Sequence, residues 1–340
     1  MRPTLLTHPA CLDHLTGIDH PERPARLAAC LRGAATAGLV PDTASPPATR
    51  ADLLRVHDAG HVDRLLALAG AHGALDDETL LTPGSVAAAL QAAGIALDGA
   101  RRLMAGQARQ VLALVRPPGH HAERARGLGF CLVNHIALAA AEARRLGAQR
   151  VAIVDIDAHF GNGTQAIHGA DPRVLLIDLH EDDLFPPGGS LADRGVDAGE
   201  GFTLNLPLLG AADRDYRALL AGLIEPALAR YRPQMVLISL GFDAHQADPL
   251  ASLRLSTRGF GELVGGIAEA TRQHGGDRLL LLLEGGYDLA ALEASTAAVA
   301  RALQHPPALP AVEPGVAAVY ARRVAAALAA LDAGLAREEP

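Results

Sequence analysis

Five short apolar runs constrain the fold of this chain more than any other feature. They lie at 111–115, 151–154, 174–177, 235–238 and 279–283. Each run is continuously apolar, which is typical of a strand buried on both faces of a parallel sheet. Stretches with helical periodicity separate or flank the runs, at 85–105, 134–147, 213–231, 257–274 and 288–303. This alternation predicts an α/β fold in which helices flank a central, mostly parallel sheet.

The length of 340 residues allows either one large domain or two. Pro-rich stretches at 41–47 and 306–314 lie near the two ends and do not separate two core-sized halves. We therefore expect a single domain over 1–340, with a core of about 5–305 and a terminal helix at 316–332 packed on it. The Gly- and Pro-rich segment 186–201 is predicted to be a surface loop.

Composition excludes several classes of protein. Hydrophobic residues make up 49% and charged residues 20% of the chain, which argues for a large core and against disorder. The net charge of −8 provides no basic footprint for nucleic acid or an anionic membrane. No apolar run approaches the ~18–20 residues of a membrane span, and the first residues lack the apolar core of a signal peptide. Three cysteines without CxxC spacing suit a reducing compartment, so we expect a cytoplasmic protein, with self-association left open.

A polar, mostly Gly-containing segment follows each of the five apolar runs. These segments are Pro-Pro-Gly-His-His at 117–121, Asp-Ile-Asp-Ala-His at 155–159, Asp-Leu-His at 178–180, Gly-Phe-Asp at 241–243 and Gly-Gly-Tyr-Asp at 285–288. In open parallel sheets, ligands bind in the crevice outside the carboxyl ends of the strands. We therefore expect the five segments to converge on one site.

Two of these segments provide a candidate metal site. Asp157 and His159 are two residues apart in extended chain, so their side chains project to the same side. With Asp243 they form an Asp₂His set, and three protein ligands with one open position are typical of catalytic zinc. Such an oxygen-rich set also accepts Fe(II) or Mn(II). The alternative, that the acidic residues only cap helices or bind loop amides, is disfavoured because uncompensated buried carboxylates are costly.

Three further side chains are candidates for proton transfer and oxyanion stabilisation. The adjacent His120 and His121 suit proton transfer better than joint ligation of one metal. Asp155 and Asn162 are candidate partners that would fix their tautomers. Tyr287 follows two glycines, which allow the backbone to approach a ligand closely. A phenol at that position can donate to a developing oxyanion.

The motifs resemble those of the metal-dependent histone deacetylase family, which includes bacterial lysine deacylases, acetylpolyamine amidohydrolases and acetoin-utilisation proteins. The resemblance covers about residues 5–305, in the order of the family. The matching stretches are HPERPARLAACL (20–31), RPPGHHAERARGLGFCLVNHIALAAA (116–141), VDIDAHFGNGTQ (154–165), GEGFTLNLPL (199–208), LISLGFDAHQADPL (237–250) and LEGGYD (283–288). The resemblance implies the three-layer arginase/deacetylase-like fold.

The resemblance also implies a role for each residue of the site. The ligands of a catalytic Zn²⁺, with Fe²⁺ as an alternative, would be Asp157, His159 and Asp243. The resemblance makes His121 the general base and acid, His120 its electrostatic partner, and Tyr287 the group that polarises the carbonyl. A structural K⁺ would bind near Asp155, Asp157, His159, Asp178 and Leu179, with Asn162 beside the site. The acyl-lysine channel would be lined by Gly129, Phe130, Phe185, Leu250, Gly285 and Gly286, and Arg23 would lie near an internal acetate cavity.

The sequence departs from the family pattern at a few positions. Phe160 stands where most relatives have a second His, His135 replaces a common Asn, and Asp178 replaces a common Ser. Relatives with the arginase-like fold bind two metals. They need further carboxylates at the positions that Gly161 and Gly241 occupy in this chain. The sequence therefore predicts one catalytic metal.

The resemblance implies metal-assisted amide hydrolysis but leaves the substrate open. Leu250 matches the position at which polyamine-selective relatives carry Glu, which favours acyl-lysine in proteins or peptides. The acidic clusters at 76–78 and 181–183 are either solvated loop charges or part of the rim, so small acetylated amines stay as an alternative. A catalytically silent module that binds acylated ligands is a third reading.

Overall fold

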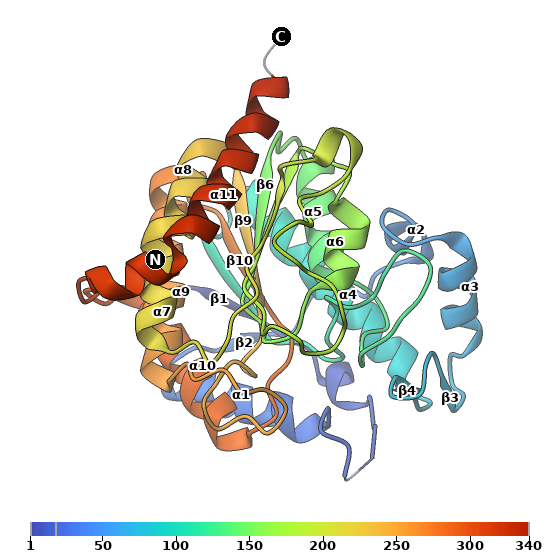
Figure 1. Cartoon of the computed structure of the whole chain (residues 1–340). Coiled ribbons are helices and arrows are strands. Elements are labelled where there is room, and N and C mark those ends of the chain that lie inside the picture. The colour runs from blue at the N-terminus through green and yellow to red at the C-terminus, as the bar shows by residue number, and fades with distance from the viewer. Residues whose placement is uncertain (1, 18, 339–340) are drawn as a thin grey trace.

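The computed structural model contains an eight-stranded sheet and describes residues 2–17 and 19–338 (Figure 1). In spatial order the strands are β2 (Pro41–Asp42), β1 (Thr4–Leu6), β5 (Gln110–Ala113), β10 (Leu279–Leu283), β9 (Met235–Leu240), β6 (Val151–Asp155), β7 (Val174–Asp178) and β8 (Thr203–Asn205). Every neighbouring pair is parallel, so the sheet is parallel throughout rather than mostly parallel. The expected α/β class is confirmed. Residues 1, 18 and 339–340 of the expected domain range lie outside the described residues.

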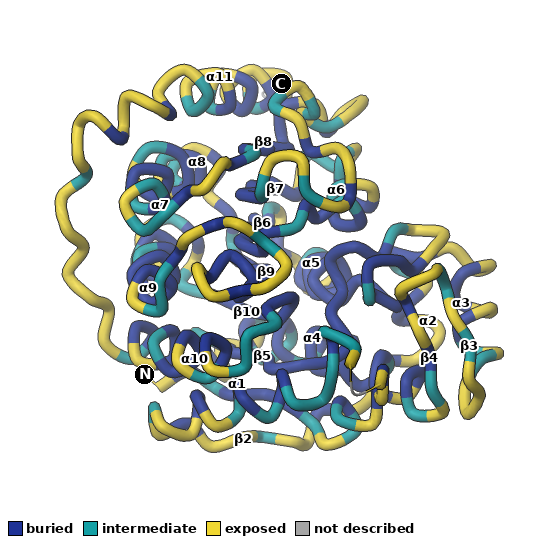
Figure 2. Tube along the Cα trace, turned by 60° about the horizontal axis from the view of Figure 1, so that its bottom comes forward, coloured by how far each residue is buried: buried dark blue, intermediate teal, exposed yellow. Residues whose placement is uncertain are grey.

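Helices cover both faces of this sheet (Figures 1 and 2). One face carries α4 (Ser85–Met104), α5 (His135–Arg145) and α6 (Asn162–His168). The other carries α1 (Pro24–Thr36), α7 (Asp213–Leu219), α8 (Glu225–Tyr231), α9 (Thr257–His274) and α10 (Leu289–Gln304). The three layers bury the five apolar strands completely or almost completely, including the all-leucine β10.

Smaller elements complete the fold. Beside α4 lie α2 (Arg50–Leu53), α3 (Ala59–Ala67) and a short antiparallel pair, β3 (Gly73–Ala74) and β4 (Leu80–Leu81), around a separate apolar cluster. Two 3₁₀ turns occur, η1 (Pro9–Leu12) and η2 (Asp197–Gly199). The expected terminal helix over 316–332 lies within α11 (Pro314–Glu338), which packs against α7, α8 and β8. Among the described helices, none combines the length and apolarity needed to cross a bilayer.

The structure corrects some expected boundaries. The helix expected over 213–231 is divided by a π turn at Leu220–Ile224, and Pro226, which has no N–H to donate, lies just after that turn. Strands β1, β2 and β8 were not expected because two or three residues are too short to form an apolar run. Segment 186–201 is irregular apart from η2.

Two of the candidate-site motifs also start helices. The side chain of Asn134 accepts a hydrogen bond from the Ala137 N–H at 2.9 Å and caps α5. The carboxylate of Asp288 accepts from the Ala291 N–H at 2.7 Å and caps α10. The segment after β10 therefore turns directly into α10, whereas α5 begins well after the His pair.

Candidate active site

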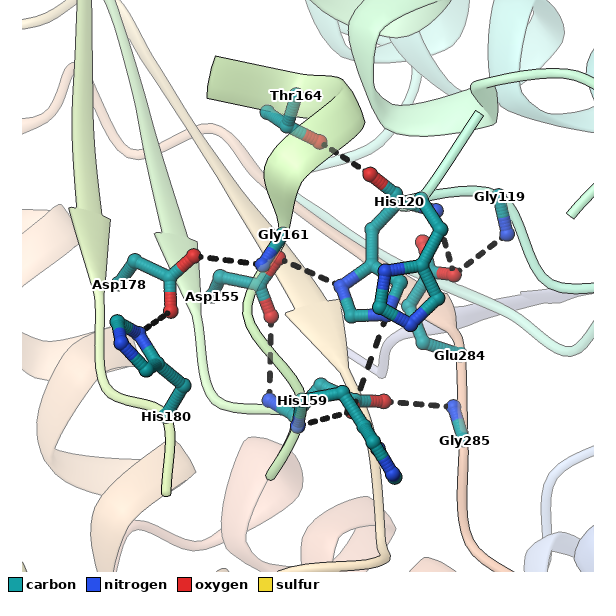
Figure 3. A network of polar contacts seen from close by, with 12 residues as sticks. Gly119, His120, Asp155, His159, Gly161, Thr164, Asp178, His180, Glu284 and Gly285 are labelled. Carbon is teal, nitrogen blue, oxygen red and sulfur yellow. Dashed lines mark hydrogen bonds and ion pairs between the residues drawn. The ribbon is translucent and has the colours of Figure 1, made fainter. Parts of the chain in front are cut away.

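The polar segments that follow β5, β6, β7 and β10 converge at the carboxyl edge of the sheet (Figure 3), and the segment after β9 joins them through Asp243. The three candidate metal ligands come from two of these strand ends. One ligand atom from each of Asp157, His159 and Asp243 lies within 4.8 Å of the others. His159 Nδ1 lies 3.1 Å from Asp157 Oδ1 and 3.1 Å from Asp243 Oδ2. The predicted set is thus brought together.

The backbone around this set fixes the two carboxylates. Asp157 Oδ2 accepts a hydrogen bond from the Gly285 N–H at 2.8 Å, and Asp243 Oδ1 accepts one from the Ala158 N–H at 2.7 Å. A Cβ on Gly285 would lie 1.9 Å from Asp243 Oδ2, and one on Gly241 would lie 2.1 Å from Asp157 Oδ2. The two glycines therefore provide the space that the carboxylates occupy.

The electrostatics of the set favour a bound cation. Both aspartates are fully buried, and their hydrogen bonds to His159 raise the pKa of that imidazole to about 10 although burial opposes its charged form. The set consists of two buried carboxylates and one imidazole. These are donor groups typical of a catalytic zinc or iron(II) site. The residues present therefore fit a divalent metal.

His120 lies between two buried carboxylates beside this set. Its Nδ1 lies 3.1 Å from Asp155 Oδ2, and its Nε2 lies 3.8 Å from Asp157 Oδ1. Burial disfavours the charged imidazole, but the carboxylates of Asp157 and Asp155 outweigh it and hold the pKa of His120 well above its usual value.

His121 has the opposite electrostatic environment. Its Nδ1 lies 2.8 Å from Asn162 Oδ1, and Asn162 Nδ2 donates to Glu123 Oε1 at 2.8 Å, so the amide oxygen faces the ring. Burial, followed by the charges of His120 and His159, lowers the pKa of His121 well below its usual value. The pKa values of the two adjacent imidazoles are thus shifted in opposite directions, although their ring centroids are only 4.0 Å apart.

Tyr287 is oriented by its backbone and by a buried arginine. The Tyr287 N–H donates to Asp248 Oδ2 at 2.7 Å, and the guanidinium of Arg26 lies 4.9 Å from the centre of the phenol ring. Arg26 Nε also donates to the Gly286 carbonyl at 2.5 Å. Burial raises the pKa of the phenol well above its usual value, so Tyr287 stays protonated and can donate a hydrogen bond.

The predicted channel residues surround the same site. A Cβ on Gly129 would lie 2.6 Å from His121 Cδ2 and 3.0 Å from Phe185 Cε1, so Gly129 lies between these two rings. Phe130 has a positive φ of 67° and is held by a hydrogen bond from its N–H to Thr79 Oγ1 at 3.1 Å. The ring centroids of Phe130 and Tyr287 are 6.1 Å apart.

The outer residues of the channel reach solvent. Phe185 is 44% exposed and Leu250 is 37% exposed. The Leu250 N–H donates to Asp248 Oδ1, whose other carboxylate oxygen holds Tyr287. Asp248 therefore connects the outer position Leu250 with the phenol.

The candidate potassium residues form a second buried cluster (Figure 3). Asp178 Oδ2 accepts from the Gly161 N–H at 2.9 Å, and a Cβ on Gly161 would lie 2.7 Å from Asp155 Oδ2. The Leu179 N–H donates to the Asp155 carbonyl at 3.1 Å. His180 Nδ1 lies 2.8 Å from Asp178 Oδ1, and this carboxylate raises the pKa of His180 although burial opposes it. Two buried carboxylates thus converge beside Gly161, an arrangement that suits a hard cation.

Three residues of the surroundings stand where the sequence departs from the family pattern. Phe160 is buried, and its ring centroid lies 5.1 Å from that of His180. His135 Nε2 lies 3.1 Å from the Pro117 carbonyl. Asp178 is the third departure, and its contacts are those of the cluster above.

The buried arginine beside Tyr287 is Arg26, whereas Arg23 is half-buried at the N-cap of α1. Sequence reasoning missed Arg26 together with its partners. Glu22 accepts hydrogen bonds from Arg116 at 2.5 and 2.6 Å and from Arg26 at 2.9 Å, and all three side chains are fully buried. The sequence signal that could have identified Glu22 and Arg26 was their place in the family-like stretch 20–31.

Glu284 was also missed, although it begins the Glu-Gly-Gly-Tyr segment. Its Oε2 accepts hydrogen bonds from the N–H groups of Gly119 and His120 at 2.6 and 3.1 Å. Burial raises the pKa of this carboxyl to about 7. Glu284 thus links the end of β10 to the His pair, and its place at a strand end was the available signal.

The acidic clusters have mainly structural contacts. Asp76 accepts hydrogen bonds from the backbone N–H groups of Glu78, Thr79 and Gly129. Glu181 accepts from the backbone N–H and the hydroxyl of Ser252. Asp77, Asp182 and Asp183 are exposed.

Comparisons with known proteins give the family. The sequence profile of the histone deacetylase domain matches residues 20–303. The chain is 41% identical over 284 residues to the histone deacetylase-like amidohydrolase of Pseudomonas aeruginosa, covering 82% of this chain and 74% of that protein. It is 35% identical over 291 residues to a probable deacetylase of Archaeoglobus fulgidus, covering 84% and 81%. It is 38% identical over 294 residues to histone deacetylase 15 of Arabidopsis thaliana, covering 84% of this chain and 52% of that protein.

The fold leads to the same family. The crystal structure of the HDA15 HD domain superposes with a TM-score of 0.87 at 33% identity, covering 96% of this chain and 95% of that one. The resemblance in the sequence motifs and the three-layer fold it implies are thereby confirmed. The chain belongs to the histone deacetylase family of amide hydrolases.

Proposed function

We propose that this chain is a single catalytic domain that removes acetyl or other short acyl groups from the ε-amine of lysine in proteins or peptides. One observation supports the proposal: the His121 imidazole, whose pKa is lowered, lies beside the Asp157–His159–Asp243 set and against the Phe185 ring. The ring centroids of His121 and His159 are 6.0 Å apart. A neutral base beside a cation-binding set is what hydrolysis of an amide requires.

The metal would be held by Asp157, His159 and Asp243, with Zn²⁺ as the proposed ion and Fe²⁺ as the alternative. When bound, it would supply the Lewis acid for polarising the amide carbonyl and activating water. We propose a structural K⁺ at the cluster of Asp155 and Asp178, next to the Leu179 backbone.

The chain's own residues handle the proton. Since Asn162 Oδ1 faces His121 Nδ1, that nitrogen carries a hydrogen and Nε2 is left as the base. His121 Nε2 takes the proton from the attacking water and then gives it to the leaving amine. Burial, followed by the charge of His120, keeps the pKa of His121 low, which favours this second transfer.

Tyr287 stabilises the oxyanion. Its phenol keeps its proton and donates to the oxygen on which negative charge develops. Asp248 fixes the backbone of Tyr287, and Arg26 lies against the ring, so the donor is oriented before the substrate arrives.

The channel favours a long aliphatic side chain over a compact polycation. Phe185 and Phe130 present apolar rings, and the outer position is the apolar Leu250. Small acetylated amines such as acetylpolyamines remain the second candidate because Asp182 and Asp183 are exposed on the loop that also contains Phe185. A silent acyl-ligand binding module lacks support, since His120, His121 and Tyr287 all lie beside the metal set.

The test is a fluorogenic acetyl-lysine peptide assay, run with and without a chelator and repeated with longer acyl-lysine, lactyl-lysine and N-acetylputrescine substrates. We expect chelator-sensitive turnover that is highest on a peptide. Higher turnover on N-acetylputrescine would favour the polyamine alternative. Binding of acetyl-lysine peptides by the metal-loaded protein without any turnover would favour the silent module.

A further inference from the structure

Two adjoining cavities lie at the amino-terminal edge of the sheet, the end opposite the candidate active site. In Figure 1 this is the upper end, where α11 finishes. The first cavity, of about 620 Å³, is lined by Gln149, Arg150, Arg173, Ala229, Arg230, Arg232, Leu335 and Glu338. The second, of about 530 Å³, is lined by Arg55, Val56, Arg124, Ala141, Arg144, Arg145, Ile167, His168, Asp171, Arg173 and Val174. Arg173 lines both, so the two form one arginine-rich depression.

The fold fixes where these arginines emerge. Arg150 and Arg173 directly precede β6 and β7, which are neighbours in the sheet. Arg232 follows α8 with a left-handed φ of 50°. Side chains from two strand starts and one helix end therefore meet at the first cavity, while α11 contributes Leu335.

The positive charge of the first cavity is partly balanced, by the Glu338 carboxylate in its lining and by two ion pairs. Arg173 pairs with Asp171 at 2.7 Å, and Arg230 pairs with Asp332 at 3.1 Å. Arg150 instead lies over the Tyr231 ring, 5.6 Å from its centre. Within residues 2–17 and 19–338, neither Arg150 nor Arg232 forms an ion pair.

In the second cavity, positively charged arginine side chains lie close together. Arg144 donates to the backbone carbonyls of Ala148 and Gln149 and forms no ion pair with a described carboxylate. Burial, followed by the charge of Arg173, lowers the pKa of Arg144. This accumulation runs against the net charge of −8 of the whole chain, so it is a local feature.

We propose that this depression binds a short phosphate chain, such as inorganic oligophosphate or the phosphate tail of a nucleotide. The planar guanidinium forks of Arg150 and Arg232 match phosphate oxygens in pairs, whereas the fork of Arg173 is taken by Asp171. Each cavity has the size that binds a small molecule. The chain's overall negative charge disfavours an extended polyanion such as nucleic acid, which would contact more than this depression.

The test measures binding by isothermal titration calorimetry on the full metal-loaded chain at low ionic strength. The probes are tripolyphosphate, ATP, adenosine and sulfate. The site variant is R150Q/R232Q, and the matched control is R64Q/R322Q, which removes the same charge from exposed arginines on α3 and α11. Circular dichroism checks folding, and R232E, a change at one exposed residue, replaces the double variant should that misfold.

We expect saturable binding of tripolyphosphate and ATP, weakened about tenfold or more in R150Q/R232Q and unchanged in R64Q/R322Q. Equal affinity for tripolyphosphate and ATP would assign recognition to the phosphate chain, whereas tighter ATP binding with measurable adenosine binding would assign it to a nucleotide. Undiminished binding in the site variant would place the anion elsewhere, for instance at the metal, and would overturn the proposal. Absence of saturable binding, or equal affinity for sulfate, would overturn it as well.

Discussion

The carboxylate of Glu284 accepts a hydrogen bond from the backbone N–H of His120 at 3.1 Å, which ties the end of β10 to the His pair after β5. The same oxygen accepts from the Gly119 N–H at 2.6 Å. Glu284 thus fixes the backbone that leads into the His pair.

Replacing Glu284 should therefore affect the position of the His pair. E284A leaves two buried N–H groups without an acceptor, which costs about 1–3 kcal/mol of stability for each. E284Q keeps one acceptor oxygen and should retain more stability and more turnover. Thermal unfolding and kcat of the three proteins check this, and equal kcat in wild type and E284A would remove Glu284 from any positioning role.

The phenol of Tyr287 should matter for turnover and not for metal binding. Y287F removes the oxyanion donor and should lower kcat about 10²–10³-fold. D243N, by contrast, removes a candidate ligand and should lose the metal. Metal content by mass spectrometry, measured beside kcat, separates the two effects, and normal turnover in Y287F would exclude the proposed donor.

Glu22 should be essential for stability. E22Q leaves the buried guanidiniums of Arg26 and Arg116 without their shared carboxylate, which should cost about 3–5 kcal/mol. D63N, which breaks the exposed pair with Arg50, is the control and should leave the unfolding midpoint unchanged. Denaturant unfolding followed by circular dichroism provides the comparison, and similar midpoints for E22Q and D63N would contradict the prediction.

The protein should become less stable as the pH is lowered, because buried histidines are neutral in the folded state. Burial lowers the pKa of His135 from 6.5 to about 4, so its neutral form is favoured in the folded state. Its contribution is fully present above pH 6.5 and is lost progressively as pH falls towards 4, by up to about 3 kcal/mol.

The substitution H135N checks this assignment. It should flatten the dependence of the unfolding free energy on pH between 6.5 and 4, whatever its effect at pH 7. His57 and His168 have pKa values lowered in the same way and should account for part of the slope that remains. An unchanged slope in H135N would show that His135 does not titrate on unfolding.

The outer channel position should influence substrate choice. L250E places a carboxylate where Leu250 is 37% exposed, and it should raise turnover of N-acetylputrescine relative to an acetyl-lysine peptide about tenfold. L250Q, which adds polarity without charge, is the matched control. A ratio that moves equally in L250E and L250Q would attribute the effect to polarity alone.

The sequence predicted the centre of this site better than its surroundings. Continuous apolar runs identify buried parallel strands, and the polar segments after them must meet at one edge, so Asp157, His159 and Asp243 could be placed together. Glu22 and Arg116 are 94 residues apart and belong to no common pattern, so their pairing depends on how α1 packs against the sheet.

Local details of the backbone could not be predicted from the sequence either. The short strands β1, β2 and β8 are stabilised by pairing with longer neighbours, and two or three residues carry no signal of that pairing. The π turn at Leu220–Ile224 preserves the helical appearance of 213–231 and so escapes periodicity.

The two glycines at which a second metal would need carboxylates have a consequence for how this scaffold could change. The Cβ of any residue at 241 would overlap Asp157 Oδ2, and one at 161 would lie 2.7 Å from Asp155 Oδ2 and 3.1 Å from Asp178 Oδ2. Aspartate introduced at either position would therefore displace an existing carboxylate instead of adding a ligand. The route from this site to a two-metal hydrolase is closed to single substitutions, because the volume that a second ion's ligands need is already filled.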